Sequence, residues 1–346
     1  MGCILALWAA SMAPAAAGAL SGSAPGGYVR TNLVSDVPGK AQVLDPNLVN
    51  AWGMAAGPST PVWVSAADSG VSTLYRGAAG ATPVSIVPLV VTIPGGAPTG
   101  QVFNTTTGFE VAPGQPAAFI FASESGNITA WNPTLGTSAA TMASTPDAVY
   151  KGLALASTSS GSYLYGANFH AGTIDVFDST FARTTVSGSF TDPNLPVGYA
   201  PFNVQEISGS LYVTYAQQDA DAHDDVPGLG HGFVDVFTPD GAFVRRLVSQ
   251  GRLDSPWGLA LAPSDFGRFS GALLVGNFGN GRIHAYDPST GRLLGTLSAN
   301  RHPIVIDGLW GLRFGNGVAG NTNSLLFTAG PKDESHGLFG MINPAS

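Results

Sequence analysis

One short sequence pattern recurs six times along this chain of 346 residues, and it constrains the fold more than any other feature. Each copy has a small or polar residue, then alternating apolar residues that end in a bulky one, then a turn. The copies are VSTLYRG (71–77), NITAWNP (127–133), GTIDVFDS (172–179), GFVDVFTP (232–239), GRIHAYDP (281–288) and GLFGMINP (337–344). Such alternation is typical of a half-buried strand that ends in a hairpin. The copies lie about 50 residues apart, a period typical of β-propellers.

The segments around each copy repeat as well. An apolar run precedes it, as in ALLVGNFG (272–279), and further upstream a glycine follows a bulky residue, as in PWGLALA (256–262). PFNVQ (201–205) takes that place in the fourth repeat, and the second repeat offers TGQVFN (99–104) or TGFEV (107–111). A turn after each copy leads into a further strand. We therefore predict an all-β, six-bladed β-propeller with four-stranded blades, in which glycine lets the innermost strands approach closely.

The N-terminal part of the chain divides into a leader and a strand. Residues 28–36 alternate apolar and polar side chains, and we expect this strand to complete the last blade and remove an open sheet edge. Residues 25–346 then form a single domain. Residues 1–24 have an apolar run followed by small residues, which predicts a signal peptide cleaved near 17–24, with a disordered alanine-rich leader as the alternative.

Composition limits the cellular compartments and the classes of partner that we expect for this chain. Cys3 is the only cysteine, so the exported chain has no disulfides, which fits secretion or a place in a bacterial envelope. The net charge of −8 argues against binding to nucleic acid or an anionic membrane surface. No later segment has the 18 uninterrupted apolar residues of a membrane span. We expect a monomer whose ligand is a small molecule, a carbohydrate or a protein.

In a propeller, the turns between the second and third strands of the blades open on one face beside the axis. Four of the six histidines fall in these turns, together with acidic and amide side chains. The predicted ligand-binding residues are Asp68, Glu124, Lys151, Asn168, His170 and Asn277. The catalytic candidates are His170, His223, His336 and Glu124. The alternatives are structural: Asp or Asn in such a turn caps the hairpin, and Lys151 forms an internal ion pair.

The fourth of these turns, QQDADAHDDVPGLGHG (217–232), is the longest and the most acidic. Its candidate metal ligands are Asp219, Asp221, His223, Asp224 and Asp225. Alternate side chains in a tight turn can aim oxygens at one point, and crowded carboxylates repel one another until a cation neutralises them. We predict Ca²⁺ here, with Zn²⁺ as the alternative if the histidine points inward. The other interpretation is a solvated acidic loop. No organic cofactor is predicted.

LLVGNFGNGRIHAYDP (273–288) and YGANFHAGTIDVFD (165–178) resemble the NHL repeat. From about residue 31 onward the chain is similar to a family of uncharacterised secreted bacterial six-bladed propellers, through stretches such as TIPGGAPTG (92–100), YAQQDADAHDD (215–225) and SPWGLALAPSDFG (255–267). The resemblance implies the fold and export, and it implies no particular activity.

Two functions of different classes remain open. The first is a binding scaffold that uses the polar mouth to hold a ligand or partner. The second is a metal-dependent hydrolase similar to a lactonase, in which a cation polarises a carbonyl and a histidine or aspartate activates water. The hydrolase requires three or four side chains around one ion, drawn from Asp68, Glu124, Asn168, His170, Asp219, His223, Asn277 and His336.

Overall fold

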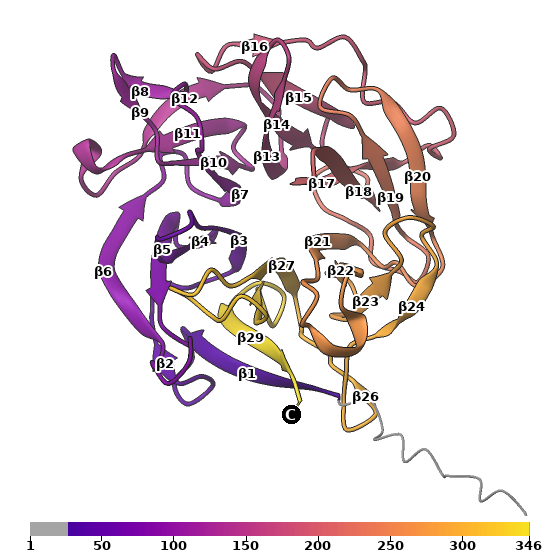
Figure 1. Ribbon diagram of the computed structural model, residues 1–346. Coiled ribbons are helices and arrows are strands. Elements are labelled where there is room, and N and C mark those ends of the chain that lie inside the picture. The colour runs from indigo at the N-terminus through magenta and orange to yellow at the C-terminus, as the bar shows by residue number, and fades with distance from the viewer. Residues whose placement is uncertain (1–26, 346) are drawn as a thin grey trace, which may run out of the picture.

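The computed structural model describes residues 27–345, and the predicted leader (1–24) lies outside them. Figure 1 shows six twisted sheets arranged radially around one axis, with the first strand of each repeat innermost. The predicted six-bladed β-propeller with four-stranded blades is therefore confirmed. No helix in the described part of the chain has the length and apolar character needed to cross a bilayer.

The blades follow one another in chain order, and blades 1 to 5 are purely antiparallel sheets. Blade 1 contains β3 (Ala51–Ala55), β4 (Val62–Ala66), β5 (Val71–Arg76) and β6 (Ser85–Thr92). Blade 2 contains β7 (Pro98–Phe103), β10 (Phe119–Ser123), β11 (Asn127–Trp131) and β12 (Ala140–Ser144). Blade 3 contains β13 (Tyr150–Thr158), β14 (Gly161–Asn168), β15 (Thr173–Phe177) and β16 (Arg183–Thr184).

The second half of the ring repeats this plan. Blade 4 contains β17 (Tyr199–Ile207), β18 (Ser210–Gln217), β19 (Phe233–Phe237) and β20 (Phe243–Ser249). Blade 5 contains β21 (Pro256–Leu261), β22 (Leu273–Asn277), β23 (Ile283–Tyr286) and β24 (Leu293–Thr296). Blade 6 contains β27 (Leu309–Phe314), β28 (Leu325–Ala329), β29 (Leu338–Pro344), β1 (Tyr28–Ser35) and β2 (Val43–Leu44).

A few short elements lie outside the blades. They are the hairpins β8 (Glu110–Ala112) with β9 (Gln115–Pro116) and β25 (Ser298–Ala299) with β26 (His302–Pro303), and the 3₁₀ turns η1 (Pro133–Leu135) and η2 (Gly267–Phe269). Of the two alternatives for the inner strand of blade 2, TGQVFN is the right one, because β7 covers most of it. TGFEV instead leads into β8, in a long excursion between β7 and β10.

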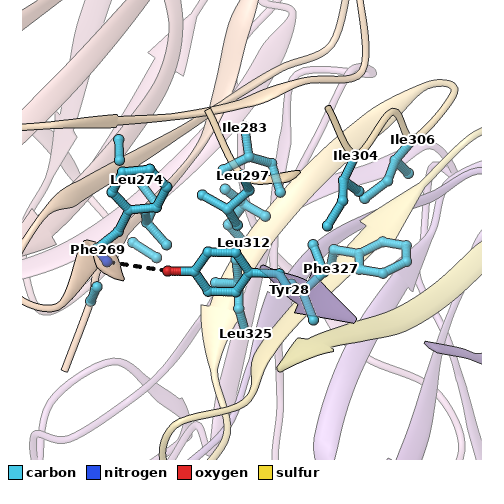
Figure 2. Close-up of a cluster of buried hydrophobic side chains, with 14 of the residues drawn as sticks. Tyr28, Phe269, Leu274, Ile283, Leu297, Ile304, Ile306, Leu312, Leu325 and Phe327 are labelled. Carbon is cyan, nitrogen blue, oxygen red and sulfur yellow. Dashed lines mark hydrogen bonds between the residues drawn. The ribbon is translucent and has the colours of Figure 1, made fainter. Parts of the chain in front are cut away.

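The N-terminal strand closes the ring, as predicted. β1 pairs antiparallel with β29, from Tyr28 opposite Pro344 to Ser35 opposite Leu338. The Tyr28 hydroxyl then reaches into blade 5, where it donates to the Phe266 carbonyl at 2.9 Å. It also accepts the Phe269 N–H at 3.2 Å, the bond drawn in Figure 2. The first strand of the domain is thus bonded to both of the last two blades.

The hydrophobic core is divided among the blade interfaces. Six buried apolar clusters each join two neighbouring blades, and a seventh lies at the axis. Figure 2 shows the cluster between blades 5 and 6, where Leu274 and Ile283 of one blade meet Leu325 and Phe327 of the other. Because each blade buries its faces only against its neighbours, the six blades form one cooperative unit.

Neighbouring innermost strands touch at one equivalent position of the repeat. Glycine occupies it in five blades, as Gly53, Gly100, Gly152, Gly258 and Gly311. A Cβ on Gly152 would lie 2.8 Å from the Cα of Asn203 in blade 4, and one on Gly100 would lie 2.8 Å from the Cα of Gly152. In blade 4 this position is Asn203, whose Nδ2 donates to the Trp257 carbonyl of blade 5 at 2.8 Å. The glycines thus permit backbone contact between blades.

We predict that Gly152→Ala destabilises the propeller, although alanine ordinarily stabilises a strand interior relative to glycine. The added methyl group meets the backbone of blade 4, and such overpacking costs about 1–3 kcal/mol of unfolding free energy. Denaturant melts of the variant and the wild type would measure this loss of unfolding free energy. The exposed Ser160→Ala, in the β13–β14 turn, should change stability by less than about 0.5 kcal/mol. A Gly152→Ala protein as stable as the wild type would contradict this account of the ring.

Candidate functional site

The residue before this contact position between innermost strands turns toward the axis in five blades, while in blade 2 it is Thr99, whose hydroxyl donates to the Tyr150 carbonyl at 2.6 Å. At this point the pairing register shifts in all six blades, and such bulges re-aim a side chain. The residues are Trp52, Thr99, Lys151, Phe202, Trp257 and Trp310. Four of them are aromatic, and together with Phe169 we name them the aromatic plug: Trp52, Phe169, Phe202, Trp257 and Trp310.

The aromatic plug fills the axis at this level. Trp52 stacks on Trp310 with ring centroids 3.7 Å apart and meets Trp257 edge-on at 6.5 Å. Phe202 lies 5.7 Å from Trp310. Blades 1 and 5 are not neighbours in the ring, nor are blades 4 and 6, so these contacts run across the axis. The plug therefore separates the two faces of the propeller.

Lys151 stands on the plug at the position that is aromatic in four other blades. Its side chain is 2% exposed, and Nζ lies 5.3 Å from the Trp52 ring centroid. The ammonium contacts the Glu124 carboxylate and lies 3.0 Å from Asp224 Oδ1. Burial alone would lower the pKa of Lys151, but Glu124 and Asp224 more than offset it, and the net shift is upward. Lys151 is thus a buried cation whose charge depends on these carboxylates.

A second cluster of polar side chains, centred on Asn50, lies beside the cluster of Lys151 and its two carboxylates. Asn50 Nδ2 donates to Glu334 Oε2 at 2.5 Å and to Asp68 Oδ1 at 3.2 Å, while its Oδ1 accepts the Trp310 indole N–H at 3.0 Å. Burial raises the pKa of Glu334 to about 7, and the charges of Glu124 and Asp224 act in the same direction. Glu334 therefore belongs to the same electrostatic site as Lys151. We name the whole group the mouth: Asn50, Asp68, Glu124, Lys151, Asp224 and Glu334.

The turn that presents Glu334 is strained. Lys332, Asp333 and Glu334 all have left-handed backbones, with φ of 56°, 51° and 66°. None is glycine, and each such residue costs about 1–2 kcal/mol. The Asp307 carboxylate accepts the Lys332 N–H at 2.9 Å and holds the turn in place. Strained backbone is common where a side chain must be held in one position. Here the strained turn places the Glu334 carboxylate near the axis.

The acidic loop of blade 4 does not place its five candidate ligands around one point. Asp219 Oδ1 accepts the His223 N–H at 2.9 Å and so caps the loop, while Asp221 is exposed. Asp224 turns to Lys151. Burial raises the pKa of Asp225 to about 6, and its Oδ2 is buried with no hydrogen-bond partner among residues 27–345.

One set of donor atoms does converge. Atoms of Glu124, His223 and Asp224 all lie within 4.8 Å of one another, the spacing of ligands around a single metal ion. His223 Nδ1 lies 3.1 Å from Asp224 Oδ1. The Lys151 ammonium contacts both carboxylates of this set, so an ion bound there would share them with the lysine.

The other predicted site residues lie on this face but act locally. Asn168 is buried, accepts the N–H groups of Val149 and Ala171, and donates to Asp175 at 3.0 Å, as a hairpin cap does. Asn277 donates to the Arg252 carbonyl at 2.8 Å.

The remaining histidines of these turns do not join the mouth. His170 is exposed. His231 Nδ1 lies 2.9 Å from the Val226 carbonyl, and His336 Nδ1 lies 2.8 Å from Asp36 Oδ2. Within the described residues, His223 alone among the histidines takes part in the converging set.

Asn50 is the mouth residue that the sequence did not indicate. It precedes the inner strand of blade 1, and its partner Glu334 lies 284 positions further along the chain. Its only local signal is its place two residues before Trp52. Neither this contact between blades 1 and 6 nor the left-handed turn that creates it has a sequence signature that could be found in advance.

Comparison with solved structures supports the fold alone. A structure titled "Streptogramin B lyase structure" covers 92% of this chain and 97% of its own, with a TM-score of 0.52 and 10% identity. No family model matches the sequence.

Two proteins of Acanthamoeba polyphaga mimivirus are similar over most of the chain. "Uncharacterized protein R648" is 33% identical over 324 residues, which is 90% of this chain and 78% of that protein. "Uncharacterized protein L690" is 32% identical over 296 residues, which is 81% of this chain and 77% of that protein. Because these relatives are viral, they do not support the bacterial family implied by the resemblance. The chain belongs to the family of these uncharacterised mimivirus proteins.

Proposed function

We propose that this protein is a binding scaffold that holds a divalent metal ion between Glu124 and Asp224 of the mouth and the neighbouring His223. The convergence of these three donor groups at the end of the axis is the observation that carries the proposal. The aromatic plug supplies a rigid base beneath them, and the blade turns leave the mouth open toward solvent, since Asp224 is 66% exposed. A ligand or partner protein would then bind at or beside the ion.

The charge balance of the mouth favours a cation. Four carboxylates belong to it, on Asp68, Glu124, Asp224 and Glu334, and the one ammonium is that of Lys151. Burial raises the pKa of Glu334 although Asn50 and Lys151 act against it, which means that its charge is only partly compensated. A second cation would relieve this imbalance.

The donor set favours Zn²⁺ over the Ca²⁺ expected from the acidic loop. Ca²⁺ takes six to eight oxygen ligands, and Asp219 and Asp221 are not aimed at the converging point. An imidazole with two carboxylates is a set that Zn²⁺ accepts, with an open fourth position. Both ions belong in the test.

The hydrolase is the less favoured alternative. It requires three or four of the eight side chains named for it around one ion, and only Glu124 and His223 of that set converge within residues 27–345. His170 is exposed, and Asn168 is a buried hairpin cap that bonds to Asp175. Lys151 already neutralises part of the carboxylate charge. The scaffold therefore remains the function that we propose.

We also propose that the protein is exported, on the basis of the leader sequence and the lack of cysteine after Cys3. Intact-mass measurement of protein recovered from the medium of a secreting host should show loss of a segment ending near residues 17–24. Recovery of an uncleaved chain confined to the cytoplasm would oppose export.

We predict that the metal-free protein binds one equivalent of Zn²⁺, and Ca²⁺ more weakly, with a rise in melting temperature, because an ion that binds only the native state stabilises it. Asp224→Asn should weaken Zn²⁺ binding by about tenfold or more, since it removes one charged ligand. Titration calorimetry and thermal melts would measure both effects.

Asp221→Asn is the matched control. It makes the same chemical change in the same loop, on an exposed side chain outside the converging set, and it should leave Zn²⁺ affinity unchanged. Absence of stoichiometric binding to the wild type, or equal losses in both variants, would refute the metal site.

Glu334 generates a prediction about pH. Its pKa in the folded protein is about 7, above the ordinary value of 4.5, so the native state binds the extra proton between these limits. Stability is therefore lost as pH rises from about 4.5 to 7. Glu334→Gln keeps an acceptor for Asn50 and removes this loss, so at pH 8 the metal-free variant should be more stable than the wild type, by on the order of 1–2 kcal/mol.

Denaturant melts at pH 5 and pH 8 would measure the difference. The exposed Asp265→Asn, far from the mouth in sequence and next to η2, should follow the wild-type pH dependence. The same slope in Glu334→Gln and the wild type would show that the charge of Glu334 is not destabilised by the mouth.

A further inference from the structure

The axis is hollow on the other side of the aromatic plug. A cavity of about 480 Å³ lies there, within the range of small-molecule sites. All six innermost strands line it, through Met54, Gln101, Leu153, Gln205, Trp257 and Arg313 among others. Trp257 belongs to the plug and forms the inner wall. We name this space the axial cavity.

The axial cavity opens on the face opposite the mouth. Its lining includes Pro58, Thr105 and Glu206, which are exposed and lie at or just beyond the ends of inner strands β3, β7 and β17. The mouth residues lie at the other ends of the same blades, in the turns between second and third strands and in the links between blades. The axial cavity is therefore a separate site from the mouth.

Arg313 gives the axial cavity an uncompensated positive charge. Its Nη2 donates to the Ala56 carbonyl at 3.1 Å, and its Nε is buried without a partner. Among residues 27–345, no carboxylate lies within 4.0 Å of the guanidinium. Burial lowers the pKa of Arg313 to about 10, so it stays charged at neutral pH, at a cost that an anion would relieve.

The one carboxylate in the lining is engaged elsewhere. Glu206 Oε1 accepts the Gly209 N–H at 2.6 Å within its own hairpin. Glu206 thus forms no ion pair with the guanidinium, and a planar fork of donors is the group that best binds a carboxylate.

Gln101 supplies a second unsatisfied group. Its Nε2 donates to the carbonyls of Gly53 and Trp63, at 2.8 and 3.1 Å, which fixes the orientation of the amide. Oε1 is then left buried without a partner, although the side chain is 6% exposed and lines the axial cavity. A buried acceptor without a donor is costly, and a ligand hydroxyl would satisfy it.

The Gln101 amide and the Arg313 guanidinium both contact the inner segment of blade 1. Gln101 touches the carbonyl of Gly53, and Arg313 touches that of Ala56. Three residues of strand span about 10 Å, so the charged and uncharged contacts lie apart along the cavity. A single inorganic ion could not meet both, whereas a short chain with a carboxylate at one end and hydroxyl groups along it could.

We propose that the axial cavity binds a small polyhydroxylated carboxylate of the sugar-acid class, with its carboxylate on the Arg313 guanidinium and a hydroxyl group donating to Gln101 Oε1. This site is independent of the metal site that we propose at the mouth.

The test compares D-gluconate with sorbitol, a neutral polyol of the same length, by titration calorimetry on the metal-free wild-type protein. Gluconate should bind with one-to-one stoichiometry and sorbitol about tenfold or more weakly, because only gluconate pairs with the guanidinium. This comparison needs no variant and so does not depend on the folding of a mutant. No gluconate binding, or equal binding of the two, would overturn the proposal.

Variants then locate the site. Arg313→Gln should abolish the preference for gluconate, while Arg292→Gln, a change of an exposed arginine immediately before β24, should preserve it. Asp224→Asn should bind gluconate as the wild type does, which separates this proposal from the one for the mouth. A preference for gluconate over sorbitol that survives Arg313→Gln, or gluconate binding that is lost in Asp224→Asn, would place the anion elsewhere and overturn the assignment.

Discussion

The backbone contact between neighbouring innermost strands is the constraint on which the rest of this molecule depends. At one position of the repeat, two strands approach so closely that a Cβ on Gly258 would lie 2.5 Å from the Trp310 carbonyl. The contact brings six strands close to one axis, and the accompanying bulge turns the preceding side chain inward. Blade 4 achieves the contact differently, because Asn203 bonds to the next blade with its side chain. The axis, the plug and both candidate sites follow from this packing.

One inward-facing position therefore determines the chemistry of the axis. Where it is tryptophan or phenylalanine, the side chains pack across the axis and exclude water. Where it is Lys151, a charge enters the same apolar layer and needs partners. Glu124 and Asp224 supply them from adjacent blades. Leaving such a charge without partners would be costly, so the acidic character of the mouth is partly a consequence of the single lysine that stands on the plug.

The sequence predicts the blades better than the site because the blades are local and the site is not. Alternation and spacing identify the strands, and the strand at 28–36 identifies the ring closure. The inner-strand glycines also mark the crowded axis. In contrast, Asn50 meets Glu334 only because the ring closes, and the left-handed turn at Lys332 has no residue type that signals it. The axial cavity was not predicted, since its lining is shared among all six blades and consists of ordinary side chains such as Gln101 and Arg313.

The two candidate sites have opposite charge requirements, and the aromatic plug explains how one axis can hold both. The mouth has excess carboxylates, whereas the axial cavity has an unpaired guanidinium. Packed rings of Trp52, Trp257 and Trp310 lie between them, and a close-packed layer does not deform continuously. Groups that share no partners and lie more than 7–10 Å apart act additively. Binding at one face should then leave affinity at the other unchanged, unless a ligand displaces a ring of the plug.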